Sequence, residues 1–322
     1  MVRRSCFFGM CMIFFIALFA PPAMGANPAA VISSLSGKVE VQRSGLDGMN
    51  TARLGDRLFE NDTVFTRKGA RVSLLSSDGS LMTLSPDSQM RVSPMMGKKG
   101  DSRVGLISKG LMKGLSGLFS SGKKRETRTI IAGIRKKADE DKGRVKVLYP
   151  RNSMILTSNP SFRWRAEGGK EPFRISLTLK GMKGELWSVE TGESEISFPE
   201  GEKGLERGQT YFLRVESEKD KTLYDEVFFR VLDEKKVQEI TDFEGKLKDL
   251  LKSNPDDGSP AFILAGFYKK QGLFHEALEM IERLEKSNPK ERFILEEKQE
   301  ILARLGLWED WKAVDKKLKG MN

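Results

Sequence analysis

The chain has 322 residues, of which 39% are hydrophobic and 31% charged, and its formal net charge is +10. This length is enough for roughly two or three domains, and the composition is compatible with packed cores under a well-solvated surface. Both cysteines lie at the extreme N-terminus and there is a single histidine, so disulfides, most zinc sites and most Ser/His or Cys/His catalytic arrangements are excluded from the rest of the chain.

The N-terminus has the pattern of a secretory signal. Arg3 and Arg4 precede an apolar run over residues 6–20, and small residues then predict cleavage near Gly25 or Ala26. The run is shorter than the about 20 residues that span a bilayer. We therefore expect residues 1–25 to be a cleaved signal peptide, the mature protein to be periplasmic or otherwise exported, and no membrane-spanning segment to remain. An uncleaved anchor is the alternative.

Residues 30–92 follow the period-2 alternation of β-strands. Asp78-Gly79 between Leu75 and Leu81 is typical of a hairpin turn. Short strands at this spacing predict an all-β roll or sandwich.

Five short motifs follow one another in this region. They are Gly37-x-Val39-x-Val41, Leu54-Gly55-Asp56-x-Leu58, Asp62-Thr63-Val64-x-Thr66, Ala70-x-Val72-x-Leu74 and Asp78-Gly79-Ser80-x-x-x-Leu84. Together they resemble the FecR-like family, named after the periplasmic domain of a ferric citrate signalling regulator. The resemblance implies an all-β FecR-like domain at 30–143 and, by analogy, envelope signalling. Near residues 129–135, where the family continues into a Gly-Thr segment and a further strand, this chain has Lys136-Lys137 instead.

The segment 94–143 is basic and rich in glycine. Residues 94–147 hold fifteen Lys or Arg against five Asp or Glu, which accounts for the whole net charge. Apolar residues spaced from Leu111 match an amphipathic helix on an anionic surface, but the intervening glycines each oppose a helix by about 0.8–1 kcal/mol. Residues 104–134 are therefore predicted to be either β-structured or an amphipathic helix. The candidate basic surface consists of Lys109, Lys113, Lys123 and Lys124.

Residues 144–232 contain further strand patterns. Residues 160–164 predict a strand with a core tryptophan, 173–179 alternate cleanly, and 224–231 supply a final strand. The run from Leu205 to Val215 resembles the tyrosine corner of fibronectin type III or immunoglobulin-like sandwiches, which implies that the Tyr211 hydroxyl bonds to nearby backbone. The aromatic side chains of this region are expected in the core.

The last third of the chain repeats itself. Lys252-Ser253-Asn254-Pro255 recurs as Lys286-Ser287-Asn288-Pro289, and Gly272-Leu273-Phe274 recurs as Gly306-Leu307-Trp308, both 34 residues later. A period of 34 is typical of helix-turn-helix arrays that bind partners.

Six residues within 258–289 resemble a tetratricopeptide repeat (TPR): Leu264, Ala265, Tyr268, Gly272, Ala277 and Pro289. The resemblance implies a TPR-like helical array at 235–318, with helices at 243–251 and within 293–318 capping the stack. First helices usually line the groove of such arrays, so Phe262, Lys269 and Lys270 are the candidate partner contacts. His275 is expected to be a solvated surface residue, and no paired carboxylates point to acid–base catalysis.

These patterns predict a multidomain protein that joins an all-β domain, a β-sandwich and an α-helical array. The first hypothesis is an exported, non-enzymatic scaffold of the periplasm or cell envelope that binds another protein through its repeats. The alternative is a binder of peptidoglycan, acidic polysaccharide or anionic lipid through residues 94–147. We expect no catalytic residues, no cofactor, no metal and no nucleic-acid partner.

Overall fold

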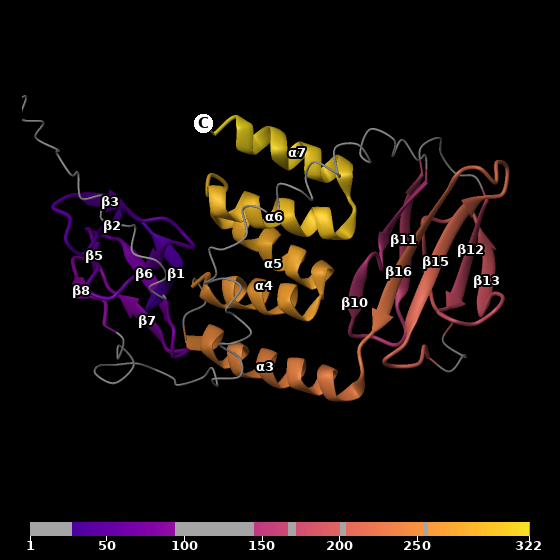
Figure 1. Ribbon diagram of the computed structural model, residues 1–322, viewed down its shortest axis with the longest axis horizontal. Coiled ribbons are helices and arrows are strands. Elements are labelled where there is room, and N and C mark those ends of the chain that lie inside the picture. Colours follow the sequence, from indigo (N-terminus) through magenta and orange to yellow (C-terminus); the bar gives the residue numbers. More distant parts are fainter. Residues whose placement is uncertain (1–27, 94–144, 167–171, 200–203, 254–256, 322) are drawn as a thin grey trace, which may run out of the picture.

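A computed structural model describes residues 28–93, 145–166, 172–199, 204–253 and 257–321 (Figure 1). The predicted signal peptide, its cleavage site and the basic segment 94–143 lie outside the described residues. The described chain combines β-sheets in its first two thirds with five helices in its last third, which is the multidomain β plus α arrangement that the sequence predicts.

The first unit, residues 28–93, is built from short strands. They are β1 (Ala30–Ser36), β2 (Val39–Gln42), β3 (Met49–Thr51), β4 (Arg57–Leu58), β5 (Thr63–Thr66), β6 (Arg71–Ser76), β7 (Leu81–Leu84) and β8 (Gln89–Arg91). They form two antiparallel sheets, with the strand orders β4-β1-β6-β7 and β3-β2-β5-β8. The predicted hairpin is confirmed, because Leu75 pairs with Leu81 and Gly79 adopts a positive φ of 90° in the turn.

The sheet that contains β1 and β6 is buried on both faces. Ile32 and Leu74 point into the core of the first unit, whereas Val31 and Leu75 belong to the core of the helical region. Successive residues of a strand face opposite sides. Strands β1 and β6 therefore contribute to two cores at once.

The second unit is a sandwich of two sheets. Its strands are β9 (Val145–Tyr149), β10 (Ser153–Ile155), β11 (Ser161–Ala166), β12 (Phe173–Leu179), β13 (Trp187–Thr191), β14 (Glu195–Ser197), β15 (Thr210–Ser217) and β16 (Tyr224–Val231). The strand orders are β10-β16-β15-β12-β13 and β14-β11-β9. β10 and β16 run parallel, and the other pairs are antiparallel.

The core of the sandwich holds the predicted aromatic residues of strand β11, since Phe162 and Trp164 are both buried. The expected hydrogen bond of Tyr211 is also confirmed, because its hydroxyl accepts from the backbone N–H of Glu206 at 2.8 Å. A buried phenol thus obtains a polar partner at the point where β15 begins.

The third unit is a stack of helices: α3 (Glu234–Ser253), α4 (Ser259–Gln271), α5 (Phe274–Ser287), α6 (Arg292–Leu305) and α7 (Trp308–Lys319). Helix α3 begins nine residues before the predicted position. The Asp233 carboxylate accepts from the Lys236 N–H at 2.9 Å, as an N-capping side chain does. Ile240, Phe243 and Leu247 then form its buried stripe.

The 34-residue spacing recurs in the backbone. Gly272 and Gly306 end helices α4 and α6 with φ of 77° and 73°, and each donates its N–H to a carbonyl three residues earlier. The next residues, Leu273 and Leu307, donate to carbonyls five residues earlier. The two hairpins α4–α5 and α6–α7 therefore share one turn geometry, in which glycine relieves the cost of a left-handed residue.

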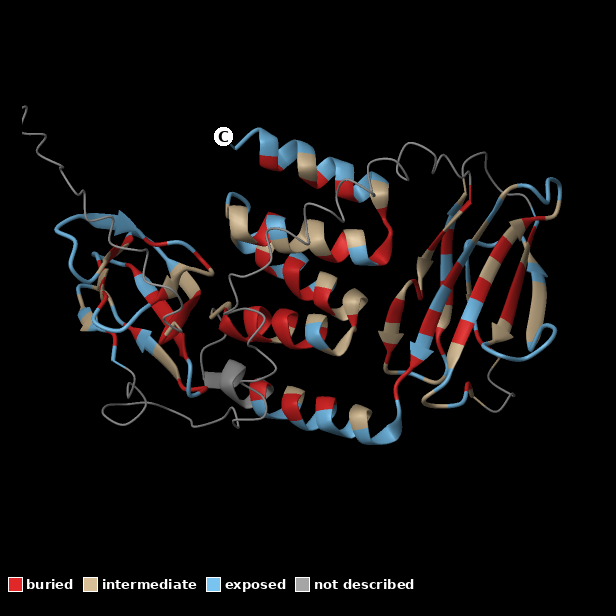
Figure 2. Cartoon of the chain, viewed as in Figure 1, coloured by how far each residue is buried: buried red, intermediate tan, exposed pale blue. Residues whose placement is uncertain are grey.

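The helices lie in successive layers between the two β units (Figure 1). One apolar core joins all three units, since it contains residues of the first unit and partly buried Leu148 and Met154 of the sandwich together with the helical residues. Helix α4 is buried along most of its length, whereas α7 has an exposed polar side, as Figure 2 shows. The array is thus held at both ends of its helices.

Candidate functional site

The sandwich meets the helical array through residues 150–154, here called the docking segment. At the first hairpin, the Ser153 hydroxyl and the Met154 N–H both donate to the carbonyl of Gly272, at 3.1 and 2.9 Å. The Ser153 hydroxyl also accepts from the N–H of Phe274 at 2.9 Å. The segment therefore satisfies the carbonyl of the C-cap residue of α4 and the first N–H of α5, groups that a helix leaves without internal partners.

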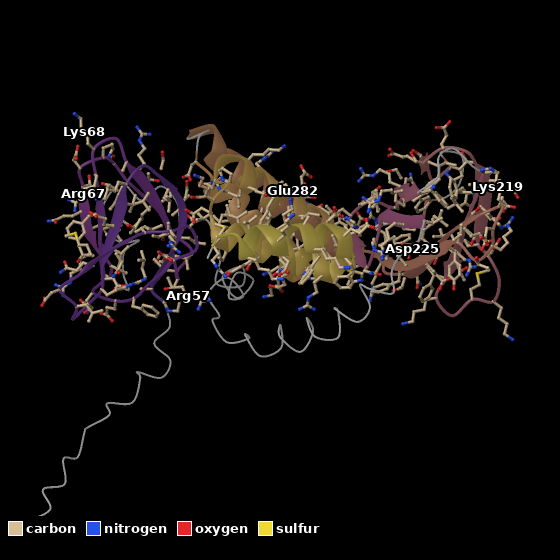
Figure 3. The ribbon with its side chains drawn as sticks, turned by 90° about the horizontal axis from the view of Figure 1, so that it is seen from above. Arg57, Arg67, Lys68, Lys219, Asp225 and Glu282 are labelled. Carbon is tan, nitrogen blue, oxygen red and sulfur yellow. The ribbon has the colours of Figure 1, made fainter. Side chains whose placement is uncertain are left out.

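The same segment reaches the second hairpin. Arg151 Nε and Asn152 Nδ2 donate to the carbonyl of Leu305 at 2.7 and 3.0 Å. Arg151 is 5% exposed and also pairs with Asp225 of β16 at 2.5 Å. Asp225 lies where the sandwich meets the helices (Figure 3). A guanidinium at the C-terminal end of α6 is favoured by the negative end of the helix dipole.

His275 lies in this contact and not on the solvated surface, which corrects the sequence expectation. Its Nε2 accepts from the backbone N–H of Arg151 at 3.0 Å, and its ring meets that of Tyr149 edge-on at 4.7 Å. Burial lowers the pKa of His275 to about 4, assisted by the nearby positive charges of Arg163 and Arg151. Burial likewise raises the pKa of Tyr149 to about 12.

Glu276 follows in the first turn of α5. Burial, with the neighbouring carboxylates of Glu279 and Glu244, raises the pKa of Glu276 to about 7. Within the part of the chain that the structure describes, its buried Oε2 has no hydrogen-bond partner. The Tyr268 hydroxyl donates to Glu244 at 2.6 Å, so the Glu244 carboxylate is hydrogen-bonded to Tyr268 and not to Glu276.

The opposite end of α4 is held by the first unit. The hydroxyls of Ser33 and Ser259 lie 2.8 Å apart, and Ser73 donates to the Asp257 carboxylate at 2.9 Å. The N–H of Gly258 donates to the Ser34 hydroxyl at 3.2 Å. Buried polar groups are tolerated when they bond to one another, so this network fixes the first unit against the array.

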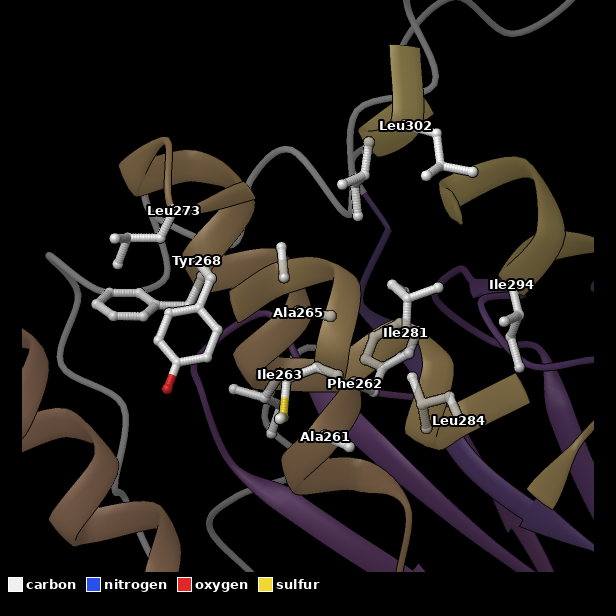
Figure 4. Close-up of a cluster of buried hydrophobic side chains, with 14 of the residues drawn as sticks. Ala261, Phe262, Ile263, Ala265, Tyr268, Leu273, Ile281, Leu284, Ile294 and Leu302 are labelled. Atoms are coloured by element: carbon white, nitrogen blue, oxygen red, sulfur yellow. The ribbon is translucent and has the colours of Figure 1, made fainter. Parts of the chain in front are cut away.

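Two of the three candidate partner contacts are placed differently from the prediction. Phe262 is 2% exposed and packs against Phe293 with ring centroids 5.7 Å apart, so its predicted contact with a partner is wrong (Figure 4). Lys269 is largely enclosed and pairs with Glu297 and Glu300 at 2.6 and 3.2 Å. Its charge therefore links helices α4 and α6.

Lys270 is exposed, as predicted. The residue 34 positions later is Arg304, which is also exposed. Both stand next to the last residue of their helices, where a positive charge is favoured by the dipole. The candidate basic residues Lys109, Lys113, Lys123 and Lys124 lie outside the described residues.

Sequence reasoning missed an exposed aromatic pair on the sandwich. Phe212 and Phe228 are paired across β15 and β16 on the outer face of the sheet, and Tyr224 lies further along β16, 47% exposed beneath the Arg214 guanidinium. The expectation that Tyr224 lies in the core is wrong. The alternation of side chains along a strand could have predicted this pair. Tyr211 and Phe229 face inward, so the adjacent residues Phe212 and Phe228 must face outward.

The described residues contain no group of three or more His, Cys, Asp or Glu side chains arranged to hold a metal ion. Among the helices of the described chain, none combines the length and hydropathy that crossing a bilayer requires.

No protein-family model and no curated protein matches this chain. Among solved structures, one titled "Cell surface anchoring domain" is similar over 24% of this chain and 99% of its own length, at 28% identity and a TM-score of 0.21. At that TM-score the likeness carries no argument about fold or function.

Proposed function

We propose that this chain is an exported, non-enzymatic scaffold of the periplasm or cell envelope that binds another protein through a TPR-like helical array. The observation that carries the proposal is the repetition of one hairpin geometry at Gly272 and Gly306. Stacked helical hairpins bury their apolar faces against one another and present helix sides to partners. The proposal includes a FecR-like first unit and a fibronectin III or immunoglobulin-like sandwich, on the resemblances of their motifs.

The arrangement of the units limits where a partner can bind. The turns of both hairpins are covered by the docking segment, and the start of α4 by the first unit. The exposed sides of the helices remain, including the repeated basic position of Lys270 and Arg304. Two exposed cations at repeated positions suit an acidic segment of a partner protein, which would compete with the Glu300 carboxylate that lies 3.9 Å from Arg304.

A truncation that removes the array is a poor test, because it would expose the apolar residues that pack against it. The sharper test reverses two charges, in the double variant Lys270→Glu and Arg304→Glu. Its matched control is Lys316→Glu with Lys319→Glu, which are also exposed lysines in the last turn of a helix. Both variants lose a similar dipole contribution of about 0.3–1 kcal/mol per residue.

Proximity labelling in the envelope is the measurement. We expect a defined set of neighbouring proteins with the native chain and the control, and loss of that set with the double variant. Identical neighbours for all three proteins would reject this binding face. Turnover of a substrate by the purified protein, or labelling confined to the cytoplasm, would reject the proposed function itself.

A further inference from the structure

His275 is the single histidine of the chain, and its hydrogen bond depends on its charge state. Nε2 accepts from the Arg151 N–H at 3.0 Å. An imidazole nitrogen can accept only while it carries no proton. The hydrogen bond between the docking segment and His275 is thus made only by the neutral ring.

The groups around His275 oppose a positive charge on it. Arg151 reaches it from the docking segment and is already paired with Asp225 of β16. Arg163 of β11 also disfavours the charge, and its guanidinium lies 5.4 Å from the centroid of the Tyr149 ring that meets the imidazole. His275 is also the second residue of α5, where the positive end of the helix dipole disfavours a cation.

The neighbouring carboxyl of Glu276 does not supply a countercharge in acid. Its pKa is raised to about 7, so it is already neutral at the pH where the imidazole gains its proton. Glu244 of α3 and Glu279 of α5 face Glu276, and Glu244 is bound to Tyr268 of α4. The burial that lowers the pKa of His275 to about 4 is therefore not offset by an anion beside it.

We propose that His275 makes the contact between the sandwich and the helical array an acid-operated latch, closed while the imidazole is neutral and released when it is protonated. Protonation removes the acceptor of the Arg151 N–H and places a third cation beside two guanidiniums. Separation of the docking segment from the hairpin turns returns the imidazolium to water, which favours the charged form. The contact of the first unit with α4 holds no imidazole and stays closed.

The test uses the full chain between pH 7 and pH 3. The carbon-bound ring protons of the single histidine report its titration in proton NMR, and small-angle X-ray scattering reports the separation of the sandwich from the array. We expect the radius of gyration to increase with a midpoint near pH 4 that coincides with the titration of the imidazole. Titration of the imidazole without any increase would overturn the proposal.

Two variants separate the imidazole from the carboxylates that also titrate in this range. His275→Gln keeps a carbonyl acceptor but no titrating ring, so it should stay closed at the pH where the native chain has opened. Opening of this variant at the native midpoint would assign the acid response to groups other than His275 and would overturn the latch.

The second variant, Arg163→Gln, removes an exposed cation that faces the imidazole and keeps the histidine, so it decides the matter even where the glutamine variant is poorly folded. We expect the imidazole pKa and the opening midpoint to rise together. An opening midpoint that stays in place while the imidazole pKa rises would contradict the proposal.

Discussion

Gly272 and Gly306 stand 34 residues apart, adopt the same left-handed backbone, and are covered by the same short segment of the sandwich. A Cβ on Gly272 would lie 3.1 Å from Cγ of Met154, and one on Gly306 would lie 3.3 Å from Nδ2 of Asn152. Glycine is needed at both positions for its backbone conformation and for the close approach of the docking segment.

We expect Gly272→Ala and Gly306→Ala each to lower the free energy of unfolding by about 1–2 kcal/mol, the cost of a left-handed residue that bears a Cβ. The control is Gly245→Ala in the exposed interior of α3, where a Cβ meets nothing within 4 Å. That variant should gain about 0.8–1 kcal/mol from helix propensity. Urea denaturation measures the free energy of unfolding of all three variants. Equal stabilities would contradict the need for glycine at positions 272 and 306.

Removal of the Tyr211 hydroxyl should destabilise the sandwich. Tyr211→Phe removes the acceptor that lies 2.8 Å from the N–H of Glu206, and because Glu206 is exposed the loss should be that of one ordinary hydrogen bond, about 0.5–1.5 kcal/mol. Tyr224→Phe is the control, because that tyrosine is 47% exposed, and it should change the stability little. Thermal unfolding followed by circular dichroism tests the pair. A similar melting temperature for both variants would show that the hydrogen bond of Tyr211 does not stabilise the sandwich.

Arg151 should be the most sensitive residue of the contact between the sandwich and the array. Arg151→Met removes the cation that pairs with Asp225 and leaves the carbonyl of Leu305 with Asn152 as its side-chain donor, and breaking a buried pair costs about 3–5 kcal/mol. Arg165→Met removes an exposed pair with Glu309 and should cost no more than about 1 kcal/mol. Guanidinium chloride denaturation checks the difference. Equal losses of stability in the two variants would show that burial does not make the ion pair of Arg151 more important than an exposed pair.

Glu276 should make the stability depend on pH. Its pKa in the folded chain, about 7, is above its ordinary value of 4.5, so folding favours the protonated form. The stabilisation is complete below about pH 4.5 and is lost as the pH rises to about 7, by roughly 3 kcal/mol. Relative to the native chain, Glu276→Gln should therefore gain stability progressively over this range.

The measurement is urea denaturation at half-unit steps between pH 4.5 and pH 8. Glu282→Gln, on the exposed side of the same helix and not among the groups that raise the pKa of Glu276, is the control and should follow the native curve closely. A constant difference between Glu276→Gln and the native chain at all pH values would show that Glu276 titrates normally.

The basic segment offers a separate test of binding to envelope polymers or anionic lipids. Neutralising Lys109, Lys113, Lys123 and Lys124 to Gln should abolish salt-sensitive cosedimentation with cell walls or anionic vesicles, if residues 94–147 bind them electrostatically. The matched control neutralises Lys68, Lys180, Lys183 and Lys316, which are exposed elsewhere. Equal loss in both variants would indicate a general effect of net charge, and no loss in either would reject this role.

Local patterns predicted the elements well because their signals are local. The alternation around Leu213 predicts β15, the Asp78-Gly79 turn fixes the register of β6 and β7, and the echo of Gly272 at Gly306 predicts two equivalent hairpins. The strand and the turn depend on backbone propensity and side-chain period within about ten residues, and the echo of Gly272 depends on a repeat of 34 residues. The start of α3 at Glu234 was missed because polar residues fill its first turn.

The sequence by itself determined the strand and helix periods, the glycine turns, the tyrosine corner and the confinement of the net charge to one segment. Only the tertiary structure decided that Phe262 is buried, that Lys269 is paired, and that His275 is enclosed between Arg151 and Tyr149. The reason is that these environments are created by residues far along the chain, such as Arg151 against Leu305, and burial and charge depend on which distant surfaces meet. A helix surface that an isolated repeat would expose to solvent is buried in this chain, because the two β units pack against the helical array.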